Sequence, residues 1–217
     1  MAELRTEEEQ ITAIKEWWKK NGSSLLIGVG AALAIVFGWQ AWQNHKIEQQ
    51  SQAVSQFQSL LNALENQDGS ERADSVAYIA GQLKDNHGKS AYAVYASLIL
   101  AQQQLVERED PQAAIETLSW AHGRSSGALG LLTRQRLAQA QFAAGDTDAA
   151  LATLRGVSDP GAFAALYAEL EGDILKAQGD RDGARRAYSL ARESLREDDR
   201  NPILDLKLAD LAVGEDA

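Results

Sequence analysis

LLIGVGAALAIVFGW, residues 25–39, is the apolar centre of a stretch without formal charge that extends over residues 21–44. The hydrocarbon core of a bilayer is about 30 Å thick, and about 20 mostly apolar residues cross it as an α-helix. Lipid offers no partner for backbone N–H and C=O groups, so a lone segment that crosses it has to be helical. The stretch therefore predicts one transmembrane helix, with expected boundaries at residues 23–43.

Two pairs of tryptophans bracket this helix, Trp17 with Trp18 and Trp39 with Trp42. About 21 residues separate Trp18 from Trp39, which corresponds to ~31 Å of helix. Indole rings favour the headgroup level of a bilayer, so all four tryptophans are predicted membrane-interface anchors. The alternative, a buried helix of a soluble protein, is disfavoured by this length and by these flanks.

The basic residues near the apolar run predict its orientation. The N-terminal side carries four of them, whereas Lys46 is followed by no Lys or Arg until Arg72. Lys and Arg close to a membrane span favour the cytoplasmic side, and acidic residues contribute little to this bias. We therefore expect residues 1–22 in the cytoplasm and residues 44–217 in the periplasm, behind a single pass through the inner membrane.

A cleaved signal peptide is the rival interpretation of the same segment. Such peptides have an apolar region of ~7–15 residues followed by small residues at the cleavage site. Here the apolar region is longer, and Trp39 lies two residues before Ala41, where a small residue is needed. An uncleaved signal anchor is the favoured reading.

Two further features of the N-terminal part suggest contacts. Thr6-Glu7-Glu8-Glu9 resembles a capping box and predicts a short amphipathic helix, which lies in the membrane interface or docks a cytoplasmic partner. Within the span, Gly30, Ala34 and Gly38 recur every four residues. Small residues at this interval allow another transmembrane helix to pack closely, although such residues are also common in spans without that role.

Composition limits what the exported part can do. The chain has 217 residues and a net charge of −10, and its first 44 residues hold four of the 21 basic and five of the 31 acidic residues. The remainder carries −9, which disfavours nucleic acid and an anionic lipid surface as partners. It is long enough for one domain with a core. The chain contains no cysteine, so disulfides and thiol chemistry are excluded.

The exported part is predicted to be all-α. Its three prolines follow Asp110, Asp159 and Asn201, the pairing expected at an N-cap and the first helical position. No stretch shows sustained alternation of apolar and polar residues, so no strand is expected.

An internal repeat organises this helical part. Ala114, Ala150 and Ala184 are separated by 36 and 34 residues, and Gly145-Asp146 and Gly179-Asp180 each begin five residues before the alanine. Glu109 takes the glycine position in the first copy. A period near ~34 residues with this pattern is typical of tetratricopeptide repeats. Gly ends the first helix because it tolerates the left-handed conformation, the following Asp helps to start the second helix, and the small Ala lets the two helices approach.

The repeat predicts a solenoid of helical hairpins over residues 90–122, 127–157 and 161–195. Two helices, at residues 46–65 and 70–83, are expected before them, and a capping helix that opens at Asn201-Pro202 is expected after them. An irregular alanine-rich bundle is the alternative.

No constellation of residues suggests catalysis. His45 is next to the membrane, whereas His87 and His122 fall at predicted helix ends, where we expect the rings to face water. No cysteine or paired histidine motif indicates a metal site, and no glycine-rich loop lies outside the span. We therefore expect no enzyme activity, no metal, no cofactor and no small-molecule substrate.

Stacked hairpins usually bind helices or extended peptides on their concave face. The candidate groove residues are Tyr92, Tyr95, Phe142 and Tyr167, although a place in the core is the favoured reading for each.

The order of parts resembles the YfgM family. The matching segments are the acidic N-terminus, residues 13–22 (AIKEWWKKNG), residues 38–42 (GWQAW), residues 95–102 (YASLILAQ), and Leu137-Ala138 after Arg134 and Arg136. This resemblance covers essentially the whole chain. It implies an ancillary subunit of the SecYEG translocon that cooperates with a PpiD-like periplasmic chaperone, helps to pass secretory polypeptides to periplasmic chaperones, and modulates an envelope stress response. The residues by themselves leave open a scaffold that assembles other envelope proteins.

Overall fold

The structure, a computed structural model, describes residues 7–196 and 199–212, and this part is helical without a strand. Its elements, in chain order, are α1 (Glu7–Asn66), α2 (Gly69–His87), α3 (Ala91–Val106), α4 (Pro111–His122), α5 (Gly127–Ala143), α6 (Thr147–Arg155), the 3-10 turn η1 (Gly161–Phe163), α7 (Ala164–Ala177), α8 (Arg181–Glu193) and α9 (Pro202–Ala212). The all-α prediction is confirmed.

The chain divides into two compact units, Met1–Gln52 and Ala53–Ala217. The described part of the first unit is a single helix that is long and apolar enough to cross a membrane, and only 6% of its most apolar window is buried. A core helix of a soluble protein is mostly buried, so this low burial supports the membrane reading. Thr6, the first residue of the expected capping box, lies outside the described residues.

The separate helices expected before, within and after the span are one uninterrupted helix, α1. The expectation of separate elements was wrong because nothing in the sequence ends the helix. Between Gly38 and Asn66 there is neither glycine nor proline, and the polar residues 43–52 are compatible with helix.

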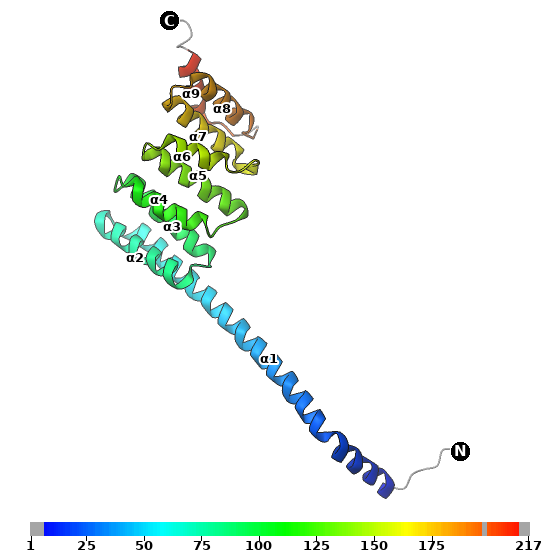
Figure 1. The fold of residues 1–217 in the computed structure, drawn as a ribbon. Coiled ribbons are helices and arrows are strands. Elements are labelled where there is room, and N and C mark those ends of the chain that lie inside the picture. The colour runs from blue at the N-terminus through cyan, green and yellow to red at the C-terminus, as the bar shows by residue number, and fades with distance from the viewer. Residues whose placement is uncertain (1–6, 197–198, 213–217) are drawn as a thin grey trace. The chain divides into compact units, whose positions relative to one another are not determined.

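The second unit is a stack of antiparallel hairpins, α3 with α4, α5 with α6, and α7 with α8 (Figure 1). Two helical segments come before these hairpins, the part of α1 from Ala53 onward and the helix α2. They pack together, because Ala53 and Leu60 share an apolar cluster with Ala80 and Leu83. The first helices of neighbouring hairpins also touch, α3 against α5 and α5 against α7. We call the second part of α1 together with α3, α5, α7 and α9 the first-helix layer.

The hairpin turns follow the predicted glycine and aspartate chemistry. Gly145 and Gly179 have φ of 85° and 84°, in the left-handed region that glycine adopts without a Cβ penalty. Asp146 and Asp180 then cap α6 and α8, because each Oδ1 accepts a hydrogen bond from the backbone N–H three residues later, at 3.0 and 2.8 Å. Glu109 occupies the same turn position with φ of 51°.

Two of the three proline predictions are confirmed. Asp110 caps α4 with Pro111 in its first turn, and the side chain of Asn201 accepts from the N–H of Leu204 at the start of α9. Pro160 instead precedes the 3-10 turn η1, and α7 begins only at Ala164. The reason lies in Gly161, whose φ of 53° interrupts a helix that would start at Pro160.

The repeated alanines lie where the hairpins close. Ala114, Ala150 and Ala184 are all fully buried, and so is Tyr188, which fills the groove one turn after Ala184. On the facing helix, Gly172 leaves room for the Tyr188 ring, because a Cβ there would overlap the ring carbons. Small residues on one helix thus admit a large one on the other, which is how the sequence sets the depth of each hairpin.

Candidate protein-interaction surface

Exposed apolar side chains concentrate on the first-helix layer. Of the eight large hydrophobic residues described as exposed in the hairpin unit, six belong to first helices and only Tyr78 and Leu190 to second helices. The six are Val54, Tyr95, Val106, Leu166, Ile203 and Leu206. Exposed apolar surface is typical of protein-interaction sites, so this layer is the candidate surface.

An aromatic group lies at the N-terminal end of this layer. The Phe57 ring of α1 is 5.5 Å from Tyr92 and 6.3 Å from Tyr95, both on α3. Tyr95 is 42% exposed, and Val54, one turn before Phe57, is 44% exposed. Aromatic side chains are the residues that most often dominate binding free energy, so this group can serve as an anchor.

The four candidate groove residues, three tyrosines and one phenylalanine, differ in how far the structure buries them. Tyr167 is buried, and its hydroxyl donates to the Leu131 carbonyl at 2.7 Å, tying α7 to α5. The favoured core reading therefore fits Tyr167, whose hydroxyl joins two first helices. Tyr92 and Phe142 pack partly buried against apolar clusters, whereas Tyr95 keeps a large exposed fraction.

Buried glutamines of the first helices were missed at the sequence level. Gln103 on α3 and Gln135 on α5 are 5% and 6% exposed, and the Oε1 atom of each lacks a hydrogen-bond partner in the structure. A glutamine on a helix normally faces water, so the sequence alone does not predict that these two side chains are buried.

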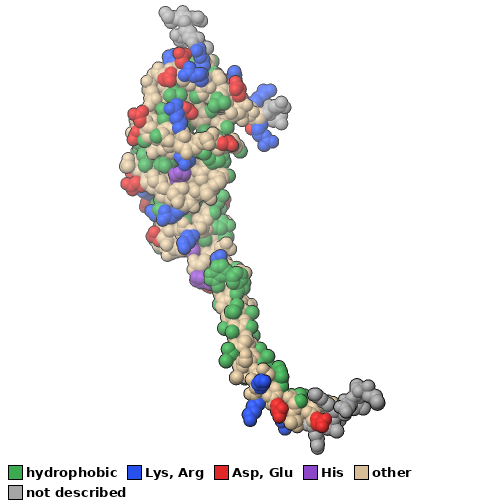
Figure 2. Space-filling model, turned by 45° about the vertical axis from the view of Figure 1, so that its right-hand side comes forward, with side chains coloured by type: hydrophobic (Ala, Val, Ile, Leu, Met, Phe, Trp, Pro, Cys, Tyr) green, Lys and Arg blue, Asp and Glu red, His purple; other side chains and the backbone are tan. Residues whose placement is uncertain are grey.

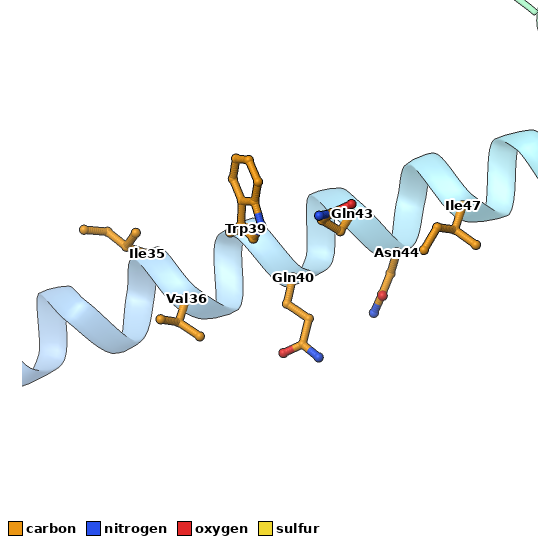
Figure 3. A pocket seen from close by; sticks show the side chains of 7 residues that line it. All are labelled: Ile35, Val36, Trp39, Gln40, Gln43, Asn44 and Ile47. Atoms are coloured by element: carbon orange, nitrogen blue, oxygen red, sulfur yellow. The ribbon is translucent and has the colours of Figure 1, made fainter.

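The predicted membrane-packing residues lie on the exposed part of α1. A Cβ added at Gly30 or Gly38 would meet no atom of the chain within 4 Å, so this face is open along its length. Side chains on α1 near the end of the apolar run leave an open depression lined by Ile35, Val36, Trp39, Gln40, Gln43, Asn44 and Ile47. Figure 3 shows them projecting outward from a single helix, so the depression is no enclosed ligand site.

The tryptophans at the two ends of the apolar run are each about half exposed, with fractions between 48% and 60% for Trp17, Trp18, Trp39 and Trp42. The rings of Trp39 and Trp42 contact each other at a tilt of 45°, with centroids 5.1 Å apart, and Lys46 Nζ lies 4.1 Å from the centroid of the Trp42 ring. Trp18 lies over Gly22. Their roles as interface anchors stay predictions.

The two histidines of the hairpin unit do not simply face water, as had been expected. His87 is only 8% exposed, and His122 Nδ1 lies 3.4 Å from the hydroxyl of Thr133, which is fully buried. Burial, followed by the charge of Arg134, lowers the pKa of His122 below its usual 6.5. Both rings lie at helix ends, but neighbouring helices cover them.

A polar cluster fixes α9 to the last hairpin. Lys207 Nζ bridges Glu169 and Asp173 of α7 at 2.8 Å each, and Tyr188 donates its hydroxyl to Asp173 at 2.8 Å. Burial and this hydrogen bond to a carboxylate raise the pKa of Tyr188, so the phenol stays protonated. Leu204 and Leu211 are buried beneath the cluster. The arrangement is that of a structural clamp, with every charged member satisfied.

Comparison with known proteins agrees with this geometry. A family model described as a tetratricopeptide repeat-like domain matches residues 15–213. The chain belongs to this family.

Curated relatives of this tetratricopeptide repeat-like chain carry a common name. Proteins of Haemophilus influenzae and Aggregatibacter actinomycetemcomitans, both named ancillary SecYEG translocon subunit, are 33% identical over 195 residues, which covers 89% of this chain and 92% of each relative. An Escherichia coli protein of the same name is 28% identical over 207 residues, 95% of this chain and 97% of its own length. No solved structure matches the chain. The resemblance to the YfgM family is confirmed.

Proposed function

We propose that this protein is an ancillary subunit of the SecYEG translocon, anchored in the inner membrane by α1, with its hairpin unit in the periplasm. The observation that carries the proposal is the combination of one exposed apolar helix with a repeat unit in which six of the eight exposed large apolar side chains lie on first helices. The shared name of three relatives supports the translocon as the place of action.

The periplasmic side is supported by the charge pattern around α1. Basic residues gather before the apolar run and are sparse for a long stretch after it. Retention of the basic flank in the cytoplasm places the hairpin unit across the membrane. There it meets polypeptides that leave the translocon.

The first-helix layer then serves as the surface for protein partners. A PpiD-like periplasmic chaperone and emerging secretory polypeptides are the partners that fit an apolar, aromatic surface on a hairpin stack. Within the membrane, the small-residue face of Gly30, Ala34 and Gly38 is suited to contact a transmembrane helix of a partner.

The test is affinity purification of the full-length protein from membranes in mild detergent, with identification of every co-purifying protein. Enrichment of SecYEG subunits together with a periplasmic chaperone is the expected result. Enrichment of unrelated envelope proteins without SecYEG would instead favour an envelope scaffold.

Two matched variants address the first-helix layer in the same assay. Tyr95→Ser removes a 42% exposed ring from α3, whereas Tyr78→Ser removes a 69% exposed ring from α2, a second helix. The chaperone is expected to be lost from the Tyr95 variant alone. Equal recovery with both variants would contradict the role of this layer.

A third variant addresses the membrane face. Gly38→Leu is expected to reduce recovery of SecYEG, because a bulky side chain holds the partner helix away. Unchanged recovery would remove the small-residue face from the proposal.

A further inference from the structure

Exposed charges are distributed unevenly over the turns and connections of the hairpin unit. The turns within hairpins, and the first turns of the second helices, carry exposed carboxylates, namely Glu107, Glu109, Asp110, Asp146, Asp148, Asp180 and Asp182. Two connections between hairpins carry exposed cations, Lys84 and Lys89 around the end of α2 and Arg124 after α4, and the exposed carboxylate beside them is Asp85. On the face shown in Figure 2, Lys, Arg and His side chains lie down the middle of the hairpin unit and Asp and Glu side chains lie along its left margin, with further charged side chains of both signs near the top and on the right.

The cations of the turns and of the connections differ in how they are paired. Near the acidic turns, Arg72 pairs with Glu107 at 3.0 Å and Arg108 pairs with Asp74 at 3.1 Å, linking α2 to the turn that follows α3. At the connections, none of Lys84, Lys89 and Arg124 forms an ion pair with any residue in the described part of the chain. These three charges are therefore available to an outside partner.

Trp120 organises two of these cations. Arg124 lies with its Cζ 4.5 Å from the centroid of the Trp120 ring, and Lys84 Nζ lies 5.6 Å from it. The same ring covers the α2–α3 connection, because a Cβ on Gly88 would sit 3.4 Å from it. Trp120 packs partly buried against an apolar cluster, so its ring is held in place between Lys84 of α2 and Arg124 of the α4–α5 connection.

An indole ring with cations beside it favours recognition of carboxylates. A guanidinium held over an indole face keeps its N–H groups in the plane of the fork, where they can form two parallel hydrogen bonds to one carboxylate. Lys84 adds an ammonium group near the same ring, and Lys89 adds a second one directly after Gly88, the residue that the ring covers. We call Lys84, Lys89, Trp120 and Arg124 the tryptophan site.

We propose that the tryptophan site docks an acidic segment of a partner polypeptide. Charge complementarity favours a short peptide over an anionic bilayer for the following reason. The hairpin unit is acidic as a whole, so a broad anionic surface meets net repulsion, whereas a short segment meets a local excess of charge in which three cations outnumber the carboxylate of Asp85. Screening restricts each charge to about 8 Å at physiological salt, which leaves this local attraction dominant.

The experiment uses the full-length protein in nanodiscs of neutral phosphatidylcholine and a labelled peptide of twelve residues rich in Glu and Asp. Fluorescence anisotropy measures Kd for this peptide and for its Gln and Asn counterpart. The acidic peptide is expected to bind, to weaken as salt is raised, and to lose about tenfold in affinity in the double variant Lys89→Gln/Arg124→Gln, as expected for two exposed ion pairs.

A matched control removes the same charge elsewhere. Arg186→Gln/Arg192→Gln alters two exposed arginines of α8 and is expected to bind the peptide like the wild type. Equal weakening by the two double variants, or equal binding of the amide peptide, would overturn the proposal. Displacement of the peptide by vesicles of anionic lipid, with equal dependence on Lys89 and Arg124, would also overturn it and assign the site to lipid.

The tryptophan site lies on connections between hairpins, apart from the exposed aromatic group around Tyr95. Failure of peptide binding would leave SecYEG recovery in the purification assay unaffected. The two tests therefore fail independently.

Discussion

Replacement of Gly172 by alanine tests how the last hairpin closes. Gly172 lies on α7 directly against the Tyr188 ring, and an added Cβ would overlap the ring carbons. Tyr188 is fully buried and donates its hydroxyl to Asp173 at 2.8 Å, so the ring has no free direction in which to move. We expect Gly172→Ala to destabilise the hairpin unit.

The magnitude follows from three contributions. Overpacking of a buried site costs about 1–3 kcal/mol, and distortion of the Tyr188 hydrogen bond costs about 1 kcal/mol. Alanine in a helix interior returns about 1 kcal/mol relative to glycine. The net loss is therefore roughly 1–3 kcal/mol, which corresponds to a fall in Tm of roughly 5 °C for a unit of this size.

Thermal unfolding followed by far-UV circular dichroism, on the full chain in a mild non-ionic detergent, measures this change. Gly81→Ala is the matched control, because Gly81 also lies inside a helix but has no atom within 4 Å of an added Cβ. That variant is expected to gain up to about 1 kcal/mol from helix propensity alone.

A double-mutant cycle decides whether the ring is the cause. In a Tyr188→Leu background the obstacle is absent, so the added Gly172→Ala substitution is expected to be neutral or stabilising. If Gly172→Ala costs as much in that background as in the wild type, the steric reasoning is refuted.

Three further substitutions have expected outcomes in the same unfolding assay. Glu109→Gly is expected to raise stability by about 0.5–1 kcal/mol. Removal of a side chain at φ of 51° relieves about 1–2 kcal/mol of backbone strain, and the larger conformational entropy of glycine in the unfolded chain offsets part of this gain. An unchanged or lower Tm would contradict this. Asp146→Ala is expected to lose about 1 kcal/mol through its cap, whereas Asp68→Ala, whose side chain makes no capping hydrogen bond, is expected to change little; equal losses would argue against capping as the cause. Burial lowers the pKa of His122, so this histidine binds a proton more readily in the unfolded chain than in the folded one. The free energy of unfolding should therefore fall as the pH drops from 6.5 through the folded-state pKa, and it should fall less in His122→Gln. Equal pH slopes in the two proteins would exclude this histidine as the source.

The turns show how much of the fold was readable from sequence. Gly145-Asp146 and Gly179-Asp180 predicted both the left-handed residue and the cap, because these two requirements are local. The apolar run at residues 25–39 was equally informative, since length and composition alone qualify it as a span. Features that depend on neighbouring residues in the sequence, such as a left-handed turn or a helix cap, can therefore be predicted from residue type.

Other features depended on distant neighbours. His87 is buried although its place at a helix end suggested exposure, and the partner of Tyr167, the Leu131 carbonyl on another hairpin, is not indicated by residue type or position. The tryptophan site was missed for the same reason, since Lys84 and Arg124 meet only after two connections are brought to one edge. The continuity of α1, in contrast, was readable from the absence of Gly and Pro after Gly38 and was overlooked.

The helix α9 is held by fewer neighbouring helices than the interior first helices. An interior first helix is enclosed by its own second helix and by the preceding hairpin, whereas the described chain offers α9 only α7 and α8. Much of its attachment is ionic, through Lys207 and Lys176, so ionic strength weakens this element more than the alanine-packed interior. Fraying at raised salt should therefore affect α9 before the preceding hairpins, so limited proteolysis is expected to cut α9 first.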